Sequence, residues 1–421
     1  MTHKIYSDLC LWRNAEAAKP LMLIGAPRVG KTYLLKQFGA SEFEHTFYAS
    51  MTDEESVAAL LDKQYQGAET FVIIDDVTKQ AAAKEVVESL LHKAPTLRIA
   101  LAGKMPDSIA DYQILHLYPL DFEEFLSAIC QDGIRAVISS GDESLITRHH
   151  EVCTRLMLHY CFTGGMPEAV NEYVTSGDLF RVRAVQTDIL NRIFGRIAAD
   201  YPLLKADKML RVLYALPEQM MSLNRIYDHK KVYEEADAAE YADAVNELVR
   251  LGLLAKIRPC VIEERTGKSV RTQIDTTSPD FKLYMCDTGL YGALVETPIY
   301  DTGISVSFHD SYNGAFSELY ALTQLLPNTF GRISYYQSEE TSIAQPAHID
   351  FIVDDDTFVY PMVVEPITMS KNPSLKAFCE QYRISTGLRL SMLRFRHHEY
   401  FPNLPLYILP CLRGWLVSHG Y

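Results

Sequence analysis

The chain has 421 residues, which accommodates two to four domains at about 100–200 residues per domain. Hydrophobic residues make up 48% of the sequence and charged residues 22%, as is ordinary for globular domains. The formal net charge of −14 argues against a protein that coats nucleic acid over its whole surface, because such binding requires phosphates to be neutralised.

No apolar run approaches the roughly 18 residues that a membrane-spanning helix requires, and the N-terminus has no uninterrupted apolar stretch of the kind that a signal peptide carries. The eight cysteines are scattered and none forms a C-x-x-C pair, which argues against zinc and disulfide frameworks. The sequence therefore predicts a protein of the reduced cytoplasm that has no membrane partner.

Short β-rich runs alternate with helical stretches over the first 120 residues. Candidate strands lie at 21–24, 45–49, 70–74, 97–102 and 113–117. The third and fourth of these runs are apolar nearly throughout, as strands covered on both faces should be. Because strands that alternate with helices form parallel sheets with right-handed crossovers, we predict an α/β fold built on a parallel sheet.

A phosphate-binding motif follows the first of these strands. Residues 25–32, GAPRVGKT, match G-x-x-x-x-G-K-[ST] and stand between a hydrophobic strand and an amphipathic helix. Backbone N–H groups and the helix N-terminus are expected to bind phosphate, Lys31 to reach the β- and γ-phosphates, and Thr32 to ligate Mg²⁺. We therefore predict ATP and Mg²⁺ as cofactors, and a nucleotide site made of Gly25, Ala26, Pro27, Arg28, Val29, Gly30, Lys31 and Thr32.

Two acids end the buried strand FVIIDDV at 71–77. Asp75 is placed to bind Mg²⁺ or its waters, and Asp76 stands where a glutamate usually polarises the attacking water. Asp76 is one methylene shorter than glutamate, and a general base must lie within hydrogen-bonding reach of the proton it takes, so the rate of hydrolysis is in question. Lys104 follows the next strand, where it either reaches phosphate or is an ordinary exposed lysine.

The middle of the chain, from about 143 to 260, is mostly helical in pattern. It is preceded by LDFEEFLSAI, in which Asp121 and Glu124 have the spacing of a capping box. A helix at 237–252 is followed by a predicted hairpin that turns near 266–267, and this order is typical of a winged helix. Residues 222–260 contain six Lys or Arg and seven acids, so DNA binding and simple domain packing both stay open.

The last 120 residues form a separate α/β unit. A helix at 313–326 precedes β-rich runs at 332–337 and 348–353, and the second of these forms a predicted hairpin around 354–357.

Taken in order, these motifs resemble a bacterial and archaeal family of AAA-type ATPases whose C-terminal domain is similar to the PD-(D/E)xK nucleases. The segments that carry the resemblance are 19–39, 117–126, 164–170, 281–294, 313–320 and 348–353. The resemblance implies a P-loop ATPase domain at 1–160, a helical and winged-helix domain at 161–295, and a nuclease-like α/β domain at 296–421.

A nuclease of that superfamily holds Mg²⁺ with an Asp and a Glu, and a Lys two residues after the Glu activates water. The resemblance assigns the acids to Asp350 and Glu365, with Glu318 on the preceding helix as an additional acid. Ile367 stands where the lysine is required, so we expect this domain to be degenerate and inactive.

The sequence thus predicts an ATP-binding AAA-type protein that hydrolyses ATP slowly through Asp76. Two alternatives stay open, a nucleotide-gated interaction scaffold without useful turnover and an ATP-regulated DNA nuclease. Besides nucleotide, the partners left open are DNA, a protein that the sequence does not identify, and further copies of the chain, since AAA-type sites often complete themselves across subunits.

Overall fold

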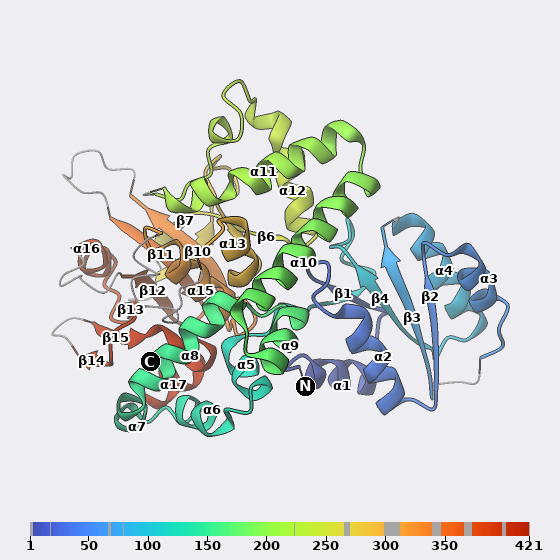
Figure 1. The fold of residues 1–421 in the computed structure, drawn as a ribbon, viewed down its shortest axis with the longest axis horizontal. Helices are drawn as coiled ribbons and strands as arrows, with labels where there is room; N and C mark the ends of the chain where they lie inside the picture. The colour runs from blue at the N-terminus through green and yellow to red at the C-terminus, as the bar shows by residue number, and fades with distance from the viewer. Residues whose placement is uncertain are drawn as a thin grey trace. The chain divides into compact units, whose positions relative to one another are not determined.

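The structure is a computed structural model that describes residues 3–16, 18–65, 69–78, 80–222, 224–264, 270–298, 312–338, 347–365, 373–397 and 401–420 (Figure 1). The chain divides into two compact units. The first comprises Met1–Pro119 and Val245–Leu254, and the second comprises Leu120–Ala244 and Ala255–Tyr421. The division into three domains at 1–160, 161–295 and 296–421 stays a prediction.

The first unit contains a five-stranded sheet in which every pairing is parallel, in the order β2-β3-β4-β1-β5. Its strands are β1 Leu21–Ile24, β2 His45–Ser50, β3 Thr70–Val77, β4 Arg98–Gly103 and β5 Gln113–His116. Its helices include α1 Tyr6–Asn14, α2 Lys31–Glu42, α3 Glu54–Leu61 and α4 Gln80–Lys93. The predicted parallel α/β fold is therefore confirmed.

The core of this unit lies on both faces of β3. On one face, the Phe71 ring packs against Trp12 and Phe38 from α1 and α2. On the other face, Val72 belongs to a buried cluster that includes Leu90 of α4. Burying one such side chain stabilises a fold by about 1.5–3 kcal/mol. Coverage on both faces explains why the run at 71–74 is apolar throughout, and it fixes the strand end that carries Asp75.

The helices of the second unit are α5 Phe122–Ala128, α6 Asp132–Ser139, α7 Glu143–Arg148, α8 His150–Thr163, α9 Pro167–Ser176, α10 Leu179–Asp200, α11 Leu203–Met221, α13 Thr288–Leu294, α15 Ala315–Leu325, α16 Pro373–Tyr382 and α17 Leu412–Ser418. Its described residues also include the 3-10 helices η2 His229–Lys231 and η3 Leu406–Cys411. The helix α12 Ala238–Arg250 begins in this unit and ends in the first. No helix among the described residues is long and apolar enough to cross a membrane.

The second unit contains a six-stranded mixed sheet, in the order β10-β11-β12-β13-β15-β14. These strands are β10 Arg332–Gln337, β11 His348–Asp354, β12 Val359–Val364, β13 Leu388–Ser391, β14 Arg396–His397 and β15 Pro402–Pro405. The antiparallel pairing of β11 with β12 confirms the hairpin predicted around 354–357. This unit therefore has a sheet of its own, as predicted.

Shorter strands follow α12. They are β6 Leu254–Ile257, β7 Cys260–Glu264, β8 Val270–Ile274 and β9 Lys282–Met285. β7 and β8 pair antiparallel as the predicted hairpin, and its expected turn at 266–267 lies outside the described residues. β6 pairs with β9 instead of joining that hairpin. The assignment of a winged helix stays a prediction.

Candidate functional site

The predicted phosphate loop connects β1 to α2. Gly25 has φ +148°, and a Cβ atom there would lie 2.2 Å from the carbonyl oxygen of Leu117. Gly30, the residue before α2, has φ +103°. Only glycine adopts such backbone conformations without strain, so the backbone geometry explains why the motif has glycine at both positions.

Lys31 and Thr32 open α2 beside this loop. The Lys31 ammonium donates hydrogen bonds to the carbonyl oxygens of Gly25 at 2.8 Å and Ala26 at 3.0 Å. The Thr32 hydroxyl donates to the Asp75 carboxylate at 2.6 Å. The sheet thus brings together the hydroxyl and the carboxylate that the sequence assigned to Mg²⁺, and oxygen donors of this kind are the ligands that Mg²⁺ prefers.

Asp76 lies at an irregularity in β3. Its φ of +53° is left-handed, and the β3–β4 register shifts between Ile74 and Val77. Its carboxylate accepts a hydrogen bond from the Ser50 hydroxyl at 3.2 Å, and its N–H donates to the Asp75 carboxylate at 2.8 Å. A non-glycine residue in this conformation costs on the order of 1–3 kcal/mol. The contacts to Ser50 and Asp75 hold Asp76 in this conformation at the end of the strand.

Tyr48 is a site residue that the sequence reasoning missed. Its hydroxyl donates to Asp75 at 3.2 Å, and the Lys36 ammonium lies 3.7 Å from the centre of its ring. Burial, followed by the negative charge of Asp75, raises the pKa of Tyr48 to about 12, so the hydroxyl remains a hydrogen-bond donor at neutral pH. The parallel register places Ser50 opposite Asp75. Pairing the predicted strand at 45–49 with the strand that carries Asp75 would therefore have indicated Tyr48 and Ser50 as neighbours of the site.

His116 ends β5 opposite Ile24, the residue before the loop. Its imidazole stacks on the ring of Tyr118, with the ring centres 3.9 Å apart. Burial, helped by the positive charge of Lys31, lowers the pKa of His116 to about 4. A neutral imidazole therefore lies on the β5 side of the phosphate loop at physiological pH.

The acids assigned to the second unit are paired with cations. Lys282 of β9 is fully buried, and its ammonium lies 3.1 Å from the Glu318 carboxylate of α15 and 3.8 Å from the Asp350 carboxylate of β11. Arg225 contacts the other oxygen of Glu318 at 2.9 Å. Burial alone would raise the pKa of Asp350, but a hydrogen bond from His348 and the charge of Lys282 hold that pKa well below its usual range.

Glu365 has a different partner. Its carboxylate accepts hydrogen bonds from both Nε and Nη2 of Arg389, and both residues are buried. In the described part of the chain, no group of three or more His, Cys, Asp or Glu side chains is arranged to hold a metal ion. Of the predicted triad, Glu318 and Asp350 share the cation of Lys282, and Glu365 pairs with Arg389, so the assignment of the three acids to a metal site stays a prediction. Ile367, at the position of the missing lysine, lies outside the described residues.

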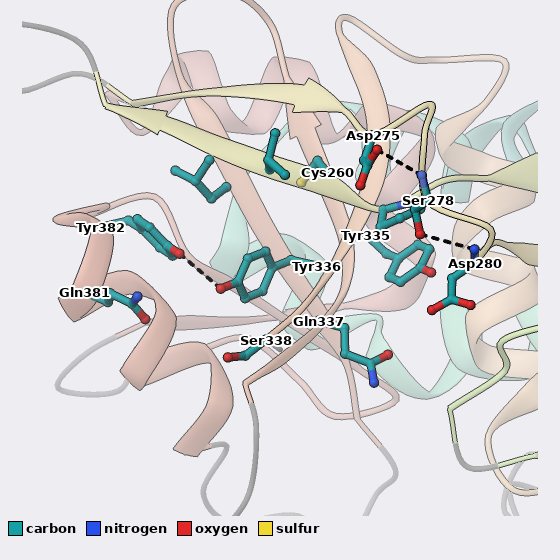
Figure 2. Close-up of a pocket in the computed structure, with 13 residues that line it drawn as sticks. Cys260, Asp275, Ser278, Asp280, Tyr335, Tyr336, Gln337, Ser338, Gln381 and Tyr382 are labelled. Carbon is teal, nitrogen blue, oxygen red and sulfur yellow. Dashed lines mark hydrogen bonds between the residues drawn. The ribbon is translucent and has the colours of Figure 1, made fainter. Parts of the chain in front are cut away.

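A polar pocket of about 590 Å³ lies elsewhere in the second unit, between β7, β10 and α16 (Figure 2). The hydroxyl groups of Tyr336 and Tyr382 are 3.0 Å apart at one side of it. Its other lining residues are Pro259, Cys260, Val261, Ile262, Asp275, Ser278, Asp280, Tyr335, Gln337, Ser338 and Gln381. None of the residues that the sequence assigned to a site lines this pocket.

Two family models match parts of the chain. Residues 17–126 match the family model of an AAA domain, and residues 154–301 match that of a domain of unknown function. No curated protein matches the chain. With the parallel sheet and the loop at 25–32, the first match identifies an AAA-type P-loop domain in the N-terminal part of the chain.

Solved structures of a DNA motor resemble the chain weakly. The Thermotoga maritima RuvB Holliday junction branch migration motor is 14% identical, over 64% of this chain and 90% of that chain, with a TM-score of 0.29. A threonine-to-valine variant of that RuvB is 15% identical, over 64% and 91% of the two chains, with a TM-score of 0.30. These scores are too low to inform the function of this chain.

Proposed function

We propose that this chain binds ATP with Mg²⁺ at the loop 25–32 and hydrolyses it slowly, and that its C-terminal domain does not cleave DNA. The observation that supports this nucleotide site is the hydrogen bond from the Thr32 hydroxyl to the Asp75 carboxylate. It lies beside the phosphate loop, where the Lys31 ammonium contacts the carbonyl oxygen of Gly25. A bound Mg²⁺ would neutralise phosphate charge and polarise the terminal phosphate. Thr32 and Asp75 are the residues that would hold it.

Asp76 would take the proton of the attacking water. Its carboxylate is already engaged by Ser50, and its side chain is shorter than that of glutamate, so its reach toward the water is reduced. This geometry favours slow turnover. A nucleotide-gated scaffold without useful turnover is the rival, and the same two features support it.

Phosphate release from ATP distinguishes these two functions. Purified chain is assayed with Lys31→Ala as the blank and Lys84→Ala as the matched lysine control, because Lys84 forms an exposed ion pair with Asp111 in the same unit. Slow release that is lost only in Lys31→Ala supports the ATPase. ATP binding by calorimetry without release supports the scaffold, and absence of both refutes the nucleotide site. Stimulation by added DNA would identify DNA as the partner.

The proposal that the nuclease-like domain is inactive rests on its buried charges. The cations of Lys282, Arg225 and Arg389 contact the carboxylates that would otherwise hold a metal ion. Incubation of plasmid and single-stranded DNA with the chain and Mg²⁺ or Mn²⁺ should leave both intact. Cleavage that disappears in Asp350→Ala would establish the alternative, an ATP-regulated nuclease.

Two further proposals concern the cellular location of the chain and its self-association. The eight cysteines, all within the described residues, form no disulfide with one another, which supports a reduced cytoplasmic location. Self-association would supply an arginine from a second copy to the ATP site, as AAA-type sites often require. Light scattering with and without ATP tests this, and a monomer under both conditions would refute it.

A further inference from the structure

The pocket of the second unit lies in the gap between two strand edges. Pro259 forms an isolated parallel bridge with Tyr335, at which the Tyr335 N–H donates to the carbonyl oxygen of Arg258 at 3.1 Å. From this bridge β7 and β10 run in the same direction but belong to different sheets. Residues 259–262 and 335–338 line the pocket between them (Figure 2). Two backbones that start together and then separate therefore form its walls.

Every second residue of β7 turns its backbone polar groups toward this gap. The Asp275 N–H donates to the carbonyl oxygen of Pro259 at 2.9 Å, so the ladder with β8 uses the backbone groups of the odd-numbered residues of β7. In an antiparallel pair, the residues between these direct their N–H and C=O groups to the opposite edge. Cys260 and Ile262 therefore present theirs on the side away from β8, on which β7 bridges β10.

β10 presents the same kind of edge from the other wall. The Ser338 N–H donates to the carbonyl oxygen of Ala347 at 2.9 Å, and Gln337 is the next residue of this ladder with β11. Gln337 therefore directs its N–H and C=O groups away from β11, on the same side as the Tyr335 N–H. In the described part of the chain β10 is the end strand of its sheet. Such an edge is a template for a further strand.

Aromatic side chains form another side of the pocket. The rings of Tyr336 and Tyr382 are 5.9 Å apart, and their hydroxyl groups are 3.0 Å apart. Both rings pack on the buried cluster that includes Cys260 and Phe378. A ligand would thus meet a fixed aromatic surface beside the two polar edges. The volume of about 590 Å³ lies within the range of about 300–1,000 Å³ that is usual for ligand sites.

The charges of the pocket are negative. Asp275 and Asp280 are among its lining residues, and the described lining contains no lysine, arginine or histidine. Hydrogen bonds from a neighbouring threonine side chain and two backbone amides lower the pKa of Asp275, so this carboxylate is ionised at neutral pH. The Arg258 guanidinium, outside the lining, donates to the carbonyl oxygens of Thr276 and Ser278 at 3.5 and 3.4 Å. The lining therefore favours a cation and disfavours phosphate.

We propose that this pocket binds an extended, basic peptide segment of a partner protein as a strand between β7 and β10. The N–H groups of Ile262 and Gln337 donate to its carbonyl oxygens, and the carbonyl oxygen of Cys260 accepts from one of its amides. A lysine or arginine of the segment lies beside Asp275 and Asp280. Main-chain hydrogen bonds then supply affinity and the carboxylates supply selectivity, as in other cases of strand addition.

The spacing of the wall groups favours a peptide over a small cation. An extended chain repeats the direction of its backbone groups every two residues, which is the separation of Cys260 from Ile262 on β7. A nucleic acid would bring phosphates to the two carboxylates, which would repel them. The proposal thus gives a chemical class to the protein partner that the sequence leaves open.

A peptide array tests the unaltered full chain in the absence of ATP. Each capped hexapeptide alternates valine with lysine, arginine, serine or glutamate. The lysine and arginine peptides should bind about tenfold or more tightly than the glutamate peptide. Methylation of alternate backbone nitrogens of the lysine peptide keeps its charge but removes donors on one edge, and should weaken binding about tenfold. Absence of binding across the array, or equal binding of the methylated peptide or of acetyl-lysine amide alone, would overturn the proposal.

Variants of the two walls test the roles of the backbone and the carboxylates. Ile262→Pro removes an N–H that the β8 ladder does not use, and should weaken binding of the lysine peptide about tenfold. Asp280→Asn should weaken the lysine peptide about fivefold and leave the serine peptide unchanged. Asp207→Asn is the matched control, because Asp207 forms an exposed pair with Arg211 at 2.7 Å elsewhere in this unit. Equal effects of Asp280→Asn and Asp207→Asn would refute selection by the carboxylates.

Hydrogen exchange of the unaltered chain locates the bound peptide and does not depend on variants that fold. With the lysine peptide, the amides of residues 259–263 and 335–338 should exchange more slowly, whereas those of β12, inside its sheet, should not change. Binding without protection of both segments would place the peptide elsewhere and overturn the proposal.

Discussion

Replacing Lys282 with methionine tests whether one buried ammonium holds the carboxylates of the second unit together. Lys282 is fully buried and lies 3.1 Å from Glu318 and 3.8 Å from Asp350. Removing one partner of a buried ion pair typically costs 3–5 kcal/mol, because it leaves a charge without compensation. Arg225 still contacts Glu318 and His348 still contacts Asp350, so we expect a loss near the lower limit, about 3 kcal/mol.

Tryptophan fluorescence can follow unfolding of this unit by itself. The chain has two tryptophans, Trp12 in the first unit and the buried Trp415 in the second. In a Trp12→Phe background, urea unfolding therefore reports on the second unit. Lys376→Met is the matched control, since Lys376 forms an exposed pair with Glu380 at 3.7 Å, and its loss should stay within about 0.5 kcal/mol.

Two outcomes would refute the reasoning. If Lys282→Met is as stable as Lys376→Met, the ammonium does not compensate the buried carboxylates. If adding Glu318→Gln to Lys282→Met recovers no stability, the loss does not come from an uncompensated charge. We also expect Mn²⁺ to stabilise Lys282→Met and not the unaltered chain, by about 2.7 kcal/mol at a hundred times its dissociation constant.

Three further predictions concern the first unit. Gly252→Ala should lose at least 1 kcal/mol of stability, because it combines a left-handed φ with a Cβ atom 2.8 Å from the amide nitrogen of Ala26. Gly177→Ala, with φ +63° and open space around the new Cβ atom, bears only the backbone strain. Equal losses of stability in thermal unfolding would contradict the close contact at Gly252. The folded-state pKa of His116, about 4, lies below its unfolded value of about 6.5, so the unfolded chain binds more protons between these pH values. Stability should therefore fall as pH decreases from about 6.5 to 4, by up to about 1.4 kcal/mol per pH unit, and His116→Asn should remove this part of the slope; an unchanged slope in urea titrations would contradict the shift. Asp76→Glu should raise the rate of phosphate release at unchanged ATP affinity, and a lower rate would show that the shorter side chain is not what limits hydrolysis.

Local signals predicted the parts of the molecule that are set by neighbours in sequence. The capping box of Asp121 and Glu124 forms as its spacing indicated, because both partners lie within one helical turn. The turn into α2 could also be predicted, because glycine at 25 and 30 is needed for a backbone that few residues adopt. The strand 71–74 was recognisable from its unbroken apolar run, since both of its faces are buried.

Partners that are distant in sequence could not be predicted in this way. Glu247 meets Lys104 across 143 residues, and Arg389 meets Glu365 across 24. The resemblance assigned Glu365 to a metal site, but no local signal indicated whether a metal ion or a guanidinium would balance its charge. Such pairings depend on which strands lie side by side, and Arg389 reaches Glu365 because β13 pairs in parallel with β12.

Charge balance allows the carboxylates of Glu318 and Asp350 to be buried. Glu318 and Asp350 carry two negative charges, and the cations of Lys282 and Arg225 neutralise both. A divalent ion would bring the same neutralisation to a nuclease site, so these two side chains supply the charge that the metal would have supplied. Adding a divalent ion to this cluster would leave it with two excess positive charges in a buried environment, where uncompensated charge is costly. We therefore predict that metal binding at Glu318 and Asp350 and the buried ammonium of Lys282 exclude each other.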